Sequence, residues 1–267
     1  MKKICIYGKG GIGKSTVVAN TAVAMSVKGL KVAVVGCDPK ADSTRCIMGR
    51  RIPTVLESVL LSGGGEVCMR GFNDILCIES GGPQPGTGCA GRGIASALKE
   101  IRDRDLLSDR DAVIYDVLGD VVCGGFSTPL REEIADDVYL VSTADFMAMY
   151  AANNICRGIR HYAQQSGIRL AGVIYNSRSM RDDADLVGTF ARRVGTDIAG
   201  RIPMSSDISL SEVKRKTAVE LFPGGEAAKA FNDLCDYMLS DRPRRCIPEP
   251  MSDEELEELC TRNAESF

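Results

Sequence analysis

A glycine-rich stretch near the N-terminus has the residue types that bind phosphate. The sequence GKGGIGKST, residues 8–16, fits the pattern G-x-x-x-x-G-K-[ST] with Gly8, Gly13, Lys14 and Ser15. Glycines let backbone N–H groups face a phosphate, a following helix adds its N-terminal dipole, and a serine hydroxyl can ligate Mg²⁺. The pattern therefore predicts a phosphate-binding loop between a strand and a helix.

Acidic residues follow two of the predicted strands. Asp38 and Asp42 lie in CDPKADST, and Asp116 and Asp120 lie in YDVLGD. Ligands of open α/β sheets bind at the carboxyl ends of the strands, where these side chains are expected. Mg²⁺ needs hard oxygen ligands and a hydrolytic water needs a carboxylate to orient it. An aspartate after a strand is also a common helix cap, which is the alternative for each of the four.

Two cysteines are flanked by glycines, Cys89 in GCAGRG and Cys123 in VVCGGF. A cysteine between glycines is either held in a tight turn or approached closely by another group. The chain has 11 cysteines and no CxxC pair, which counts against a zinc ribbon or a ferredoxin-type cluster within one chain. Most of the others are expected to be small buried hydrophobic residues.

These residues need a scaffold, and the apolar pattern predicts one. Short apolar runs rich in β-branched residues alternate with longer segments of helical spacing, which is typical of a parallel sheet covered on both faces. We expect a doubly wound, mostly parallel α/β fold of the P-loop NTPase type over residues 1–240. The expected strands are 3–8, 31–37, 75–80, 112–117, 138–143 and 170–176, and the expected helices include 15–29 and 146–167.

Residues 241–267 differ in character and are expected to form an extended C-terminal tail with a short helix. The segment RPRRCIPEP, residues 242–250, is rich in proline and arginine. Ser252 and Glu255 then have the spacing of a capping box that opens an acidic helix. Such a tail either wraps a surface or another subunit, or remains a solvated appendage.

The composition is that of an ordinary globular protein. Of the 267 residues, 44% are hydrophobic and 26% are charged, with a formal net charge of -3. Proteins that bind nucleic acid or anionic membranes without specificity carry a positively charged surface. This chain has no basic tail or stripe. The apolar run at the N-terminus is too short for a signal segment or a membrane span. We therefore expect a cytoplasmic protein that binds neither nucleic acid nor membrane.

The long motifs resemble those of the nitrogenase iron protein family, and they occur in the same order over most of residues 1–180. The wider family includes ATP-dependent reductases of protochlorophyllide, chlorophyllide, a nickel tetrapyrrole and methylthio-alkanes. The motifs that carry the resemblance are YGKGGIGKS, GCDPKADSTR, ESGGPQPGTGCAGRG, YDVLGDVVCGGF, YAANNI and YNSR.

The resemblance implies a homodimer that holds one [4Fe-4S] cluster on its twofold axis. By position the ligands are Cys89 and Cys123 of each chain, and twofold symmetry turns two thiolates into the four that a cubane takes. MgATP binding and hydrolysis to MgADP would be coupled to transfer of one low-potential electron. The implied partners are a larger catalytic component and a ferredoxin or flavodoxin as electron donor.

The resemblance also implies roles for single residues. Two lysines in one loop are the deviant Walker A pattern of a dimeric ATPase class, in which the early lysine, here Lys9, acts on the partner's nucleotide. Asp38 and Asp42 belong to the Mg²⁺ and water environment, and Asp120 orients the attacking water. Arg92 matches an arginine of the docking face. The expected nucleotide contacts are Gly10, Gly11, Gly13, Lys14, Ser15 (also a Mg²⁺ ligand), Thr16, Asp42, Asp116 and Asn176, which matches an adenine-contacting asparagine.

Some positions depart from the family pattern. Gln84 and Thr87 stand in PQPGTGC, where the usual reading is PEPGVGC, and Ser205 stands where an aspartate that contacts the nucleotide is expected. Asp207 is nearby as a possible replacement.

Two other functions share the nucleotide residues, namely a deviant-Walker partitioning or positioning ATPase and an iron-sulfur cluster carrier ATPase. The paired glycine-flanked cysteines distinguish the reductase from the partitioning ATPase.

Overall fold

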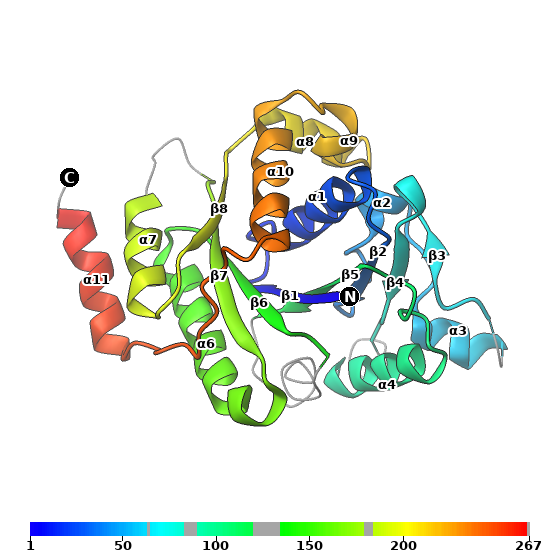
Figure 1. The fold of residues 1–267 in the computed structure, drawn as a ribbon, viewed down its shortest axis with the longest axis horizontal. Helices are drawn as coiled ribbons and strands as arrows, with labels where there is room; N and C mark the ends of the chain where they lie inside the picture. The colour runs from blue at the N-terminus through cyan, green and yellow to red at the C-terminus, as the bar shows by residue number, and fades with distance from the viewer. Residues whose placement is uncertain (63–64, 83–89, 120–133, 179–183, 266–267) are drawn as a thin grey trace.

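The computed structural model describes residues 1–62, 65–82, 90–119, 134–178 and 184–265 (Figure 1). Within these ranges eight strands form one sheet in the order β3-β4-β2-β5-β1-β6-β7-β8. All neighbouring strands are parallel except β3 and β4, which are antiparallel. The expected doubly wound, mostly parallel fold is confirmed.

The six strands expected from apolar runs are present with small shifts at their ends. Their central residues are buried because both faces of the sheet are covered. Two further strands were not expected, because β3 has two residues and β8 is short and contains an exposed arginine. The strands are β1 Lys2–Gly8, β2 Val32–Cys37, β3 Met69–Arg70, β4 Leu76–Glu79, β5 Ala112–Leu118, β6 Asp137–Ser142, β7 Arg169–Asn176 and β8 Ile198–Ile202.

Helices cover the sheet on two sides (Figure 1). One face packs against α1 (Lys14–Val27), α2 (Arg45–Met48), α9 (Ala218–Leu221) and α10 (Glu226–Leu239). The opposite face packs against α3 (Val55–Ser62), α4 (Ala90–Asp103), α6 (Phe146–Ser166) and α7 (Ala184–Arg193). The remaining short elements are the 3-10 turn η1 (Phe72–Asp74) and α8 (Ser206–Val213).

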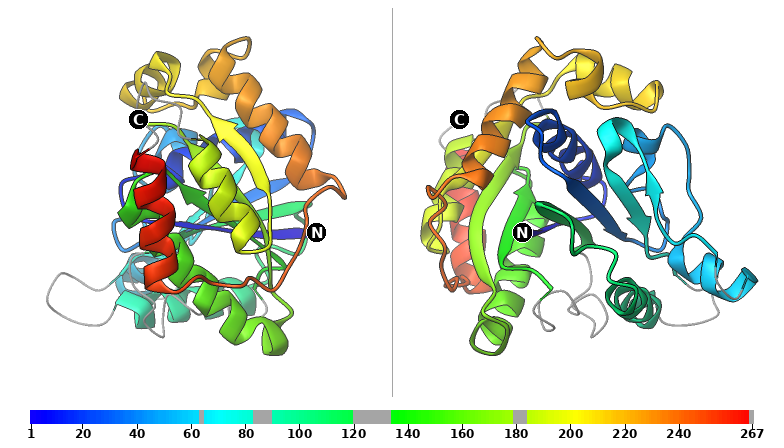
Figure 2. Two further views of the ribbon diagram at one scale, coloured as in Figure 1. Left: turned by 90° about the vertical axis from the view of Figure 1, so that its left-hand side faces the viewer. Right: turned by 45° about the vertical axis from the view of Figure 1, so that its right-hand side comes forward.

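The C-terminal segment docks on the chain that precedes it. Figure 2 shows it leaving α10, crossing beside β7 and ending in α11 (Asp253–Glu265), which lies against α6 and α7. Cys246 forms an antiparallel bridge with Leu170 at the start of β7. The capping box is confirmed, since Ser252 N donates to Glu255 Oε2 at 2.8 Å and Glu255 N donates to Ser252 Oγ at 3.2 Å. The division at residue 240 stays a prediction.

Buried polar side chains fix the docked segment in place. Arg245 forms two bonds to the buried carboxylate of Asp137, Nε to Oδ1 at 2.6 Å and Nη2 to Oδ2 at 2.9 Å. Asn153, in the expected motif YAANNI, exchanges two bonds with the backbone of Met251. Within the described ranges, none of the helices combines the length and apolar character needed to cross a membrane.

Candidate nucleotide-binding site

The predicted phosphate-binding loop joins the carboxyl end of β1 to the first turn of α1. Gly11 and Gly13 have φ values of 77° and 86°, in the left-handed region that favours glycine. Gly13 is the N-cap residue of α1 and provides no side-chain cap. The backbone N–H groups of the first helical turn are thus open to an anion, and the helix dipole favours negative charge there.

Asn176, at the end of β7, holds this loop from the opposite side. Its Nδ2 donates to the carbonyl oxygen of Ile12 at 2.6 Å. A Cβ atom at Gly13 would lie 2.6 Å from the same Nδ2, so only glycine fits beside this amide. Arg178 donates to the carbonyl oxygen of Gly11. Two residues of the YNSR motif therefore fix the conformation of the loop, a role that the sequence did not indicate for Arg178.

Lys14 and Asp116 form an ion pair beneath the loop. The Lys14 side chain is 6% exposed and that of Asp116 is 0% exposed. Asp116 lies on β5 beside Ile6 of β1, whose strand leads into the loop. Because Lys14 also lines the cleft described next, Asp116 places a desolvated ammonium group where a phosphate would bind.

A cleft of about 510 Å³ opens above the loop. It is lined by nine of the residues that the sequence singled out: Lys9, Gly11, Gly13, Lys14, Ser15, Thr16, Asp38, Asp42 and Asn176. Gly10 is exposed and does not line this cleft, and Asp116 lies below it as the partner of Lys14. Residues from the ends of β1, β2 and β7 thus meet at one edge of the sheet, as expected for an open α/β fold.

Asp38 and Asp42 differ in their surroundings. Asp38 is buried and accepts a bond from the backbone N of Lys40 at 2.9 Å, whereas Asp42 is exposed. Burial raises the pKa of Asp38, and the neighbouring Asp42 carboxylate adds to this. A cation in the cleft would offset both effects, so this pair of carboxylates suits a divalent ion.

Other cleft residues were not singled out from the sequence. The hydroxyl of Thr16 donates to Glu212 of α8, and both side chains line the cleft. Lys40 lines it as well. Glu212 belongs to no motif and comes to the cleft only through the packing of α8, so no sequence signal pointed to it.

The position of Ser205 is explained by the capping of α8. Ser205 lines the cleft and its Oγ accepts from the backbone N of Asp207 at 3.1 Å, which caps the helix. Asp207 does not line the cleft, and its Oδ2 would lie 2.6 Å from a Cβ at Gly225, the N-cap of α10. Asp207 therefore faces the start of α10 rather than taking the place of the missing aspartate.

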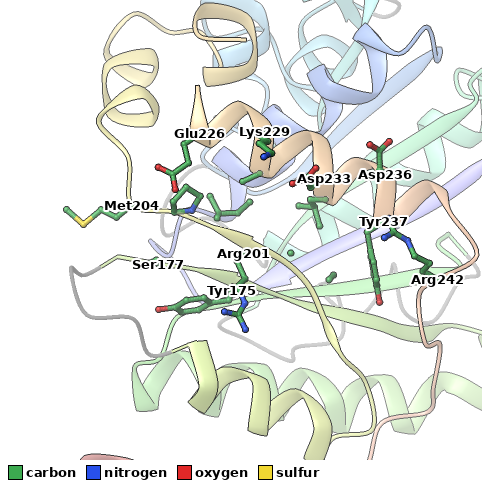
Figure 3. A pocket seen from close by; sticks show the side chains of 16 residues that line it. Tyr175, Ser177, Arg201, Met204, Glu226, Lys229, Asp233, Asp236, Tyr237 and Arg242 are labelled. Atoms are coloured by element: carbon green, nitrogen blue, oxygen red, sulfur yellow. The ribbon is translucent and has the colours of Figure 1, made fainter. Parts of the chain in front are cut away.

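A second cleft of about 860 Å³ adjoins the first between β7, β8 and α10 (Figure 3). The two clefts share Ser177, Ile202, Pro203 and Met204. In Figure 3 the labelled acidic side chains of α10 stand over β8 together with Lys229, and Arg242 lies beside the ring of Tyr237. Like the first cleft, the second cleft is lined by both acidic and basic side chains.

Cys89, Cys123 and Asp120 lie outside the described residues, as do Gln84 and Thr87. Arg92 is described and is exposed on α4. Among the described residues no group of three or more cysteine, histidine or acidic side chains could hold a metal ion. The nine described cysteines are free, and burial raises the pKa of each thiol.

The sequence was compared with protein families and with curated proteins. Residues 2–266 match a family model described as 4Fe-4S iron sulfur cluster binding proteins, NifH/frxC family. The nitrogenase iron protein of Methanococcus voltae is 47% identical over 267 residues, which cover 97% of this chain and 95% of the relative. Nitrogenase iron protein 2 of Methanothermobacter thermautotrophicus is 47% identical over 263 residues, covering 97% of both chains.

Solved structures with the same fold are more distant in sequence. The septum site-determining protein MinD from Pyrococcus horikoshii, complexed with Mg-ADP, superposes with a TM-score of 0.69 at 18% identity, covering 88% of this chain and 94% of that one. A ParA family ATPase from Chlorobium tepidum gives a TM-score of 0.65 at 20% identity, covering 90% and 98%. At these identities the likeness concerns the fold.

Proposed function

The chain belongs to the NifH/frxC family of 4Fe-4S iron sulfur cluster binding proteins, and on this premise we propose that it is the ATP-dependent reductase component of a two-component enzyme of nitrogenase type. In this proposal a homodimer couples MgATP hydrolysis to the transfer of one electron to a larger catalytic component. The observation that carries the proposal is the phosphate loop and its buried Lys14–Asp116 pair in a chain 47% identical to nitrogenase iron proteins.

The donor groups in the cleft fit MgATP. Open N–H groups at the start of α1 and the Lys14 ammonium suit phosphate oxygens, and the Ser15 hydroxyl and the Asp38 and Asp42 carboxylates suit Mg²⁺. We propose that Asn176 and Ser205 border the base, since both line the cleft. Lys9 also lines the cleft of its own chain, and we propose that in the dimer it acts on the nucleotide of the partner subunit.

The cysteine chemistry supports a shared cluster. A [4Fe-4S] cluster takes four thiolates, and raised pKa values disfavour the thiolate at each of the nine described cysteines. The resemblance to the family points to Cys89 and Cys123 as the ligands, and the sequence flanks both with glycines. We propose that two chains contribute these four thiolates on a twofold axis. When bound, the cluster would supply the low-potential electron.

Further assignments follow from the same proposal. Asp120 orients the attacking water, Arg92 of α4 lies on the surface that docks the catalytic component, and a ferredoxin or flavodoxin reduces the cluster. Exposure of the Arg92 side chain is compatible with docking. The names of the relatives favour a nitrogenase as the catalytic component, which anaerobic pull-down and reduction of dinitrogen, acetylene, tetrapyrroles or methylthio compounds would identify.

The test is iron content and nucleotide binding of the anaerobically purified chain. We expect about four irons per dimer, as one cubane requires, and loss of this iron in Cys89→Ser and in Cys123→Ser. Cys260→Ser is the control, because Cys260 is a half-buried thiol on α11. An iron-free dimer after reconstitution, or unchanged iron in Cys89→Ser, contradicts the proposal and favours a partitioning ATPase. Iron that moves to apo-proteins without reduction of a docked partner favours a cluster carrier.

A further inference from the structure

A buried glutamate at the end of β4 lies beside the nucleotide cleft without lining it. Glu79 is 0% exposed. Its Oε1 accepts two bonds from Thr44, one from the backbone N and one from the hydroxyl, each 2.7 Å long. Thr44 ends the segment 38–44, which contains Asp38 and Asp42. A carboxylate that accepts two bonds within a buried site is a strong anchor for the backbone that donates them.

Glycine at position 36 makes room for this carboxylate. Gly36 of β2 pairs with Glu79 of β4 on one side and with Asp116 of β5 on the other. A Cβ at Gly36 would lie 2.0 Å from Oε2 of Glu79 and 2.9 Å from Cβ of Ser43. Paired residues of neighbouring parallel strands face the same side, so Glu79 and Asp116 flank Gly36 on the face covered by α1.

Both carboxylates keep one oxygen without a hydrogen-bond partner among the described residues, Oε2 of Glu79 and Oδ2 of Asp116. The other oxygen of Asp116 is bonded to Lys14. Burial raises the pKa of Glu79 to about 7, and the neighbouring carboxylates of Asp116 and Asp42 add to the increase. Glu79 is therefore electrostatically sensitive to the charges at the floor of the cleft.

Local contacts hold the start and the middle of segment 38–44. It leaves β2 at Cys37, and Ala41 adopts a left-handed φ of 53° in the turn closed by its own N–H bond to Asp38 O at 3.0 Å. On the side of β4, Gly82 approaches Pro39 so closely that a Cβ there would lie 2.7 Å from Pro39 Cβ. The bonds from Thr44 to Glu79 thus fix the far end of the segment.

We propose that Glu79 is a positioning residue of the nucleotide cleft. Through its bonds to Thr44 it holds the Asp38–Thr44 segment next to the Lys14–Asp116 pair. This inference rests on the proposed function, because it assigns Asp38 and Asp42 to the Mg²⁺ of a bound nucleotide. Glu79 touches neither nucleotide nor metal. It acts through Thr44, so its removal affects the Mg²⁺-dependent part of nucleotide binding.

The experiment measures ADP affinity with Mg²⁺ and with EDTA in the anaerobically purified wild type, Glu79→Ala, Glu79→Gln and Glu57→Ala. Removing the two buried bonds from Thr44 is expected to weaken MgADP binding about tenfold in Glu79→Ala. ADP binding in EDTA should change less than about twofold, as the phosphate loop is untouched. Glu79→Gln keeps an acceptor oxygen for Thr44 and should restore most of the MgADP affinity.

Glu57→Ala is the matched control, because Glu57 also exchanges bonds with a threonine, Thr54, but does so at the start of α3. Hydrogen exchange of the Thr44 amide gives a second readout and should accelerate in Glu79→Ala and not in Glu57→Ala. Equal losses of affinity with Mg²⁺ and with EDTA, or unchanged MgADP affinity in a folded Glu79→Ala, would overturn the proposal. Failure of the wild type to bind ADP at all would instead contradict the proposed function.

Discussion

Asn176 and Gly13 are complementary: the side-chain amide of Asn176 occupies the space that a side chain at residue 13 would need, 2.6 Å from the position of its Cβ. The same amide donates to Ile12 O. The phosphate loop is thereby held between β1 and β7, which are separated in the sheet by β6. Nucleotide affinity should consequently depend on a residue far from the loop in sequence.

Asn176→Ala should weaken ADP binding about tenfold, since it releases the loop backbone and removes about 1 kcal/mol of hydrogen bonding. Isothermal titration at constant pH measures the affinity. Asn153→Ala is a suitable control. The side-chain amide of Asn153 also forms hydrogen bonds with backbone groups, but these belong to Met251 in the C-terminal segment. Equal ADP affinity in Asn176→Ala and Asn153→Ala would show that the loop does not need this contact.

Lys14→Met should cost about 3–5 kcal/mol in the free energy of unfolding, because it leaves the buried Asp116 carboxylate unpaired. The double variant Lys14→Met/Asp116→Asn removes that charge and should recover most of this stability. Neither variant should bind ADP, since both lack the ammonium group. Urea unfolding and ADP titration separate the two effects, and a double variant no more stable than Lys14→Met would refute the argument.

Glu79 should give the free energy of unfolding a distinct pH dependence. Its pKa is about 7 in the folded chain against an ordinary 4.5, so the folded chain binds the proton more tightly than the unfolded chain. The contribution to stability is therefore full below pH 4.5 and is lost as the pH rises through about 7, a change of about 3 kcal/mol. Glu79→Gln should lack this loss.

Urea unfolding of the wild type and of Glu79→Gln between pH 5 and pH 8, under the same buffer series, tests this expectation. Asp38, whose pKa is also raised, is present in both proteins and cancels in the comparison. Parallel stability curves for the two proteins would mean that the Glu79 carboxyl does not titrate in this range.

Arg245→Met should destabilise the chain by about 1–3 kcal/mol, because it leaves the Asp137 carboxylate buried without its two charged bonds. Arg244→Met is the matched control, since Arg244 is the neighbouring residue and is exposed. Thermal or urea unfolding measures the difference. If the two variants are equally stable, the docked C-terminal segment does not depend on this ion pair.

The sequence was sufficient for the features that depend on local pattern. Apolar runs located six strands, and the loop motif located the N-terminus of α1 and the lysine that pairs with Asp116. It could not locate β8, whose five residues include Gly200 and Arg201 and acquire their pairing only from β7. Local pattern cannot specify such tertiary pairing.

Residues that act through distant contacts were missed for the same reason. Glu212 reaches Thr16 across 196 positions, and Glu79 reaches Thr44 across 35, so neither pair has a spacing that a motif could reveal. The sequence left open whether Asp207 replaces the missing aspartate, and the structure places Asp207 outside the cleft, facing Gly225 at the start of α10.

The central place of β1 in the sheet has a consequence for synthesis of the chain. β1 is the first strand to be made, yet its two neighbours are β5 and β6, which begin at Ala112 and Asp137. The side chains of Asn176 and Arg178 then donate hydrogen bonds to the backbone of the loop. During synthesis the loop therefore gains its bonds to Asn176 and Arg178 only after most of the sheet has emerged from the ribosome.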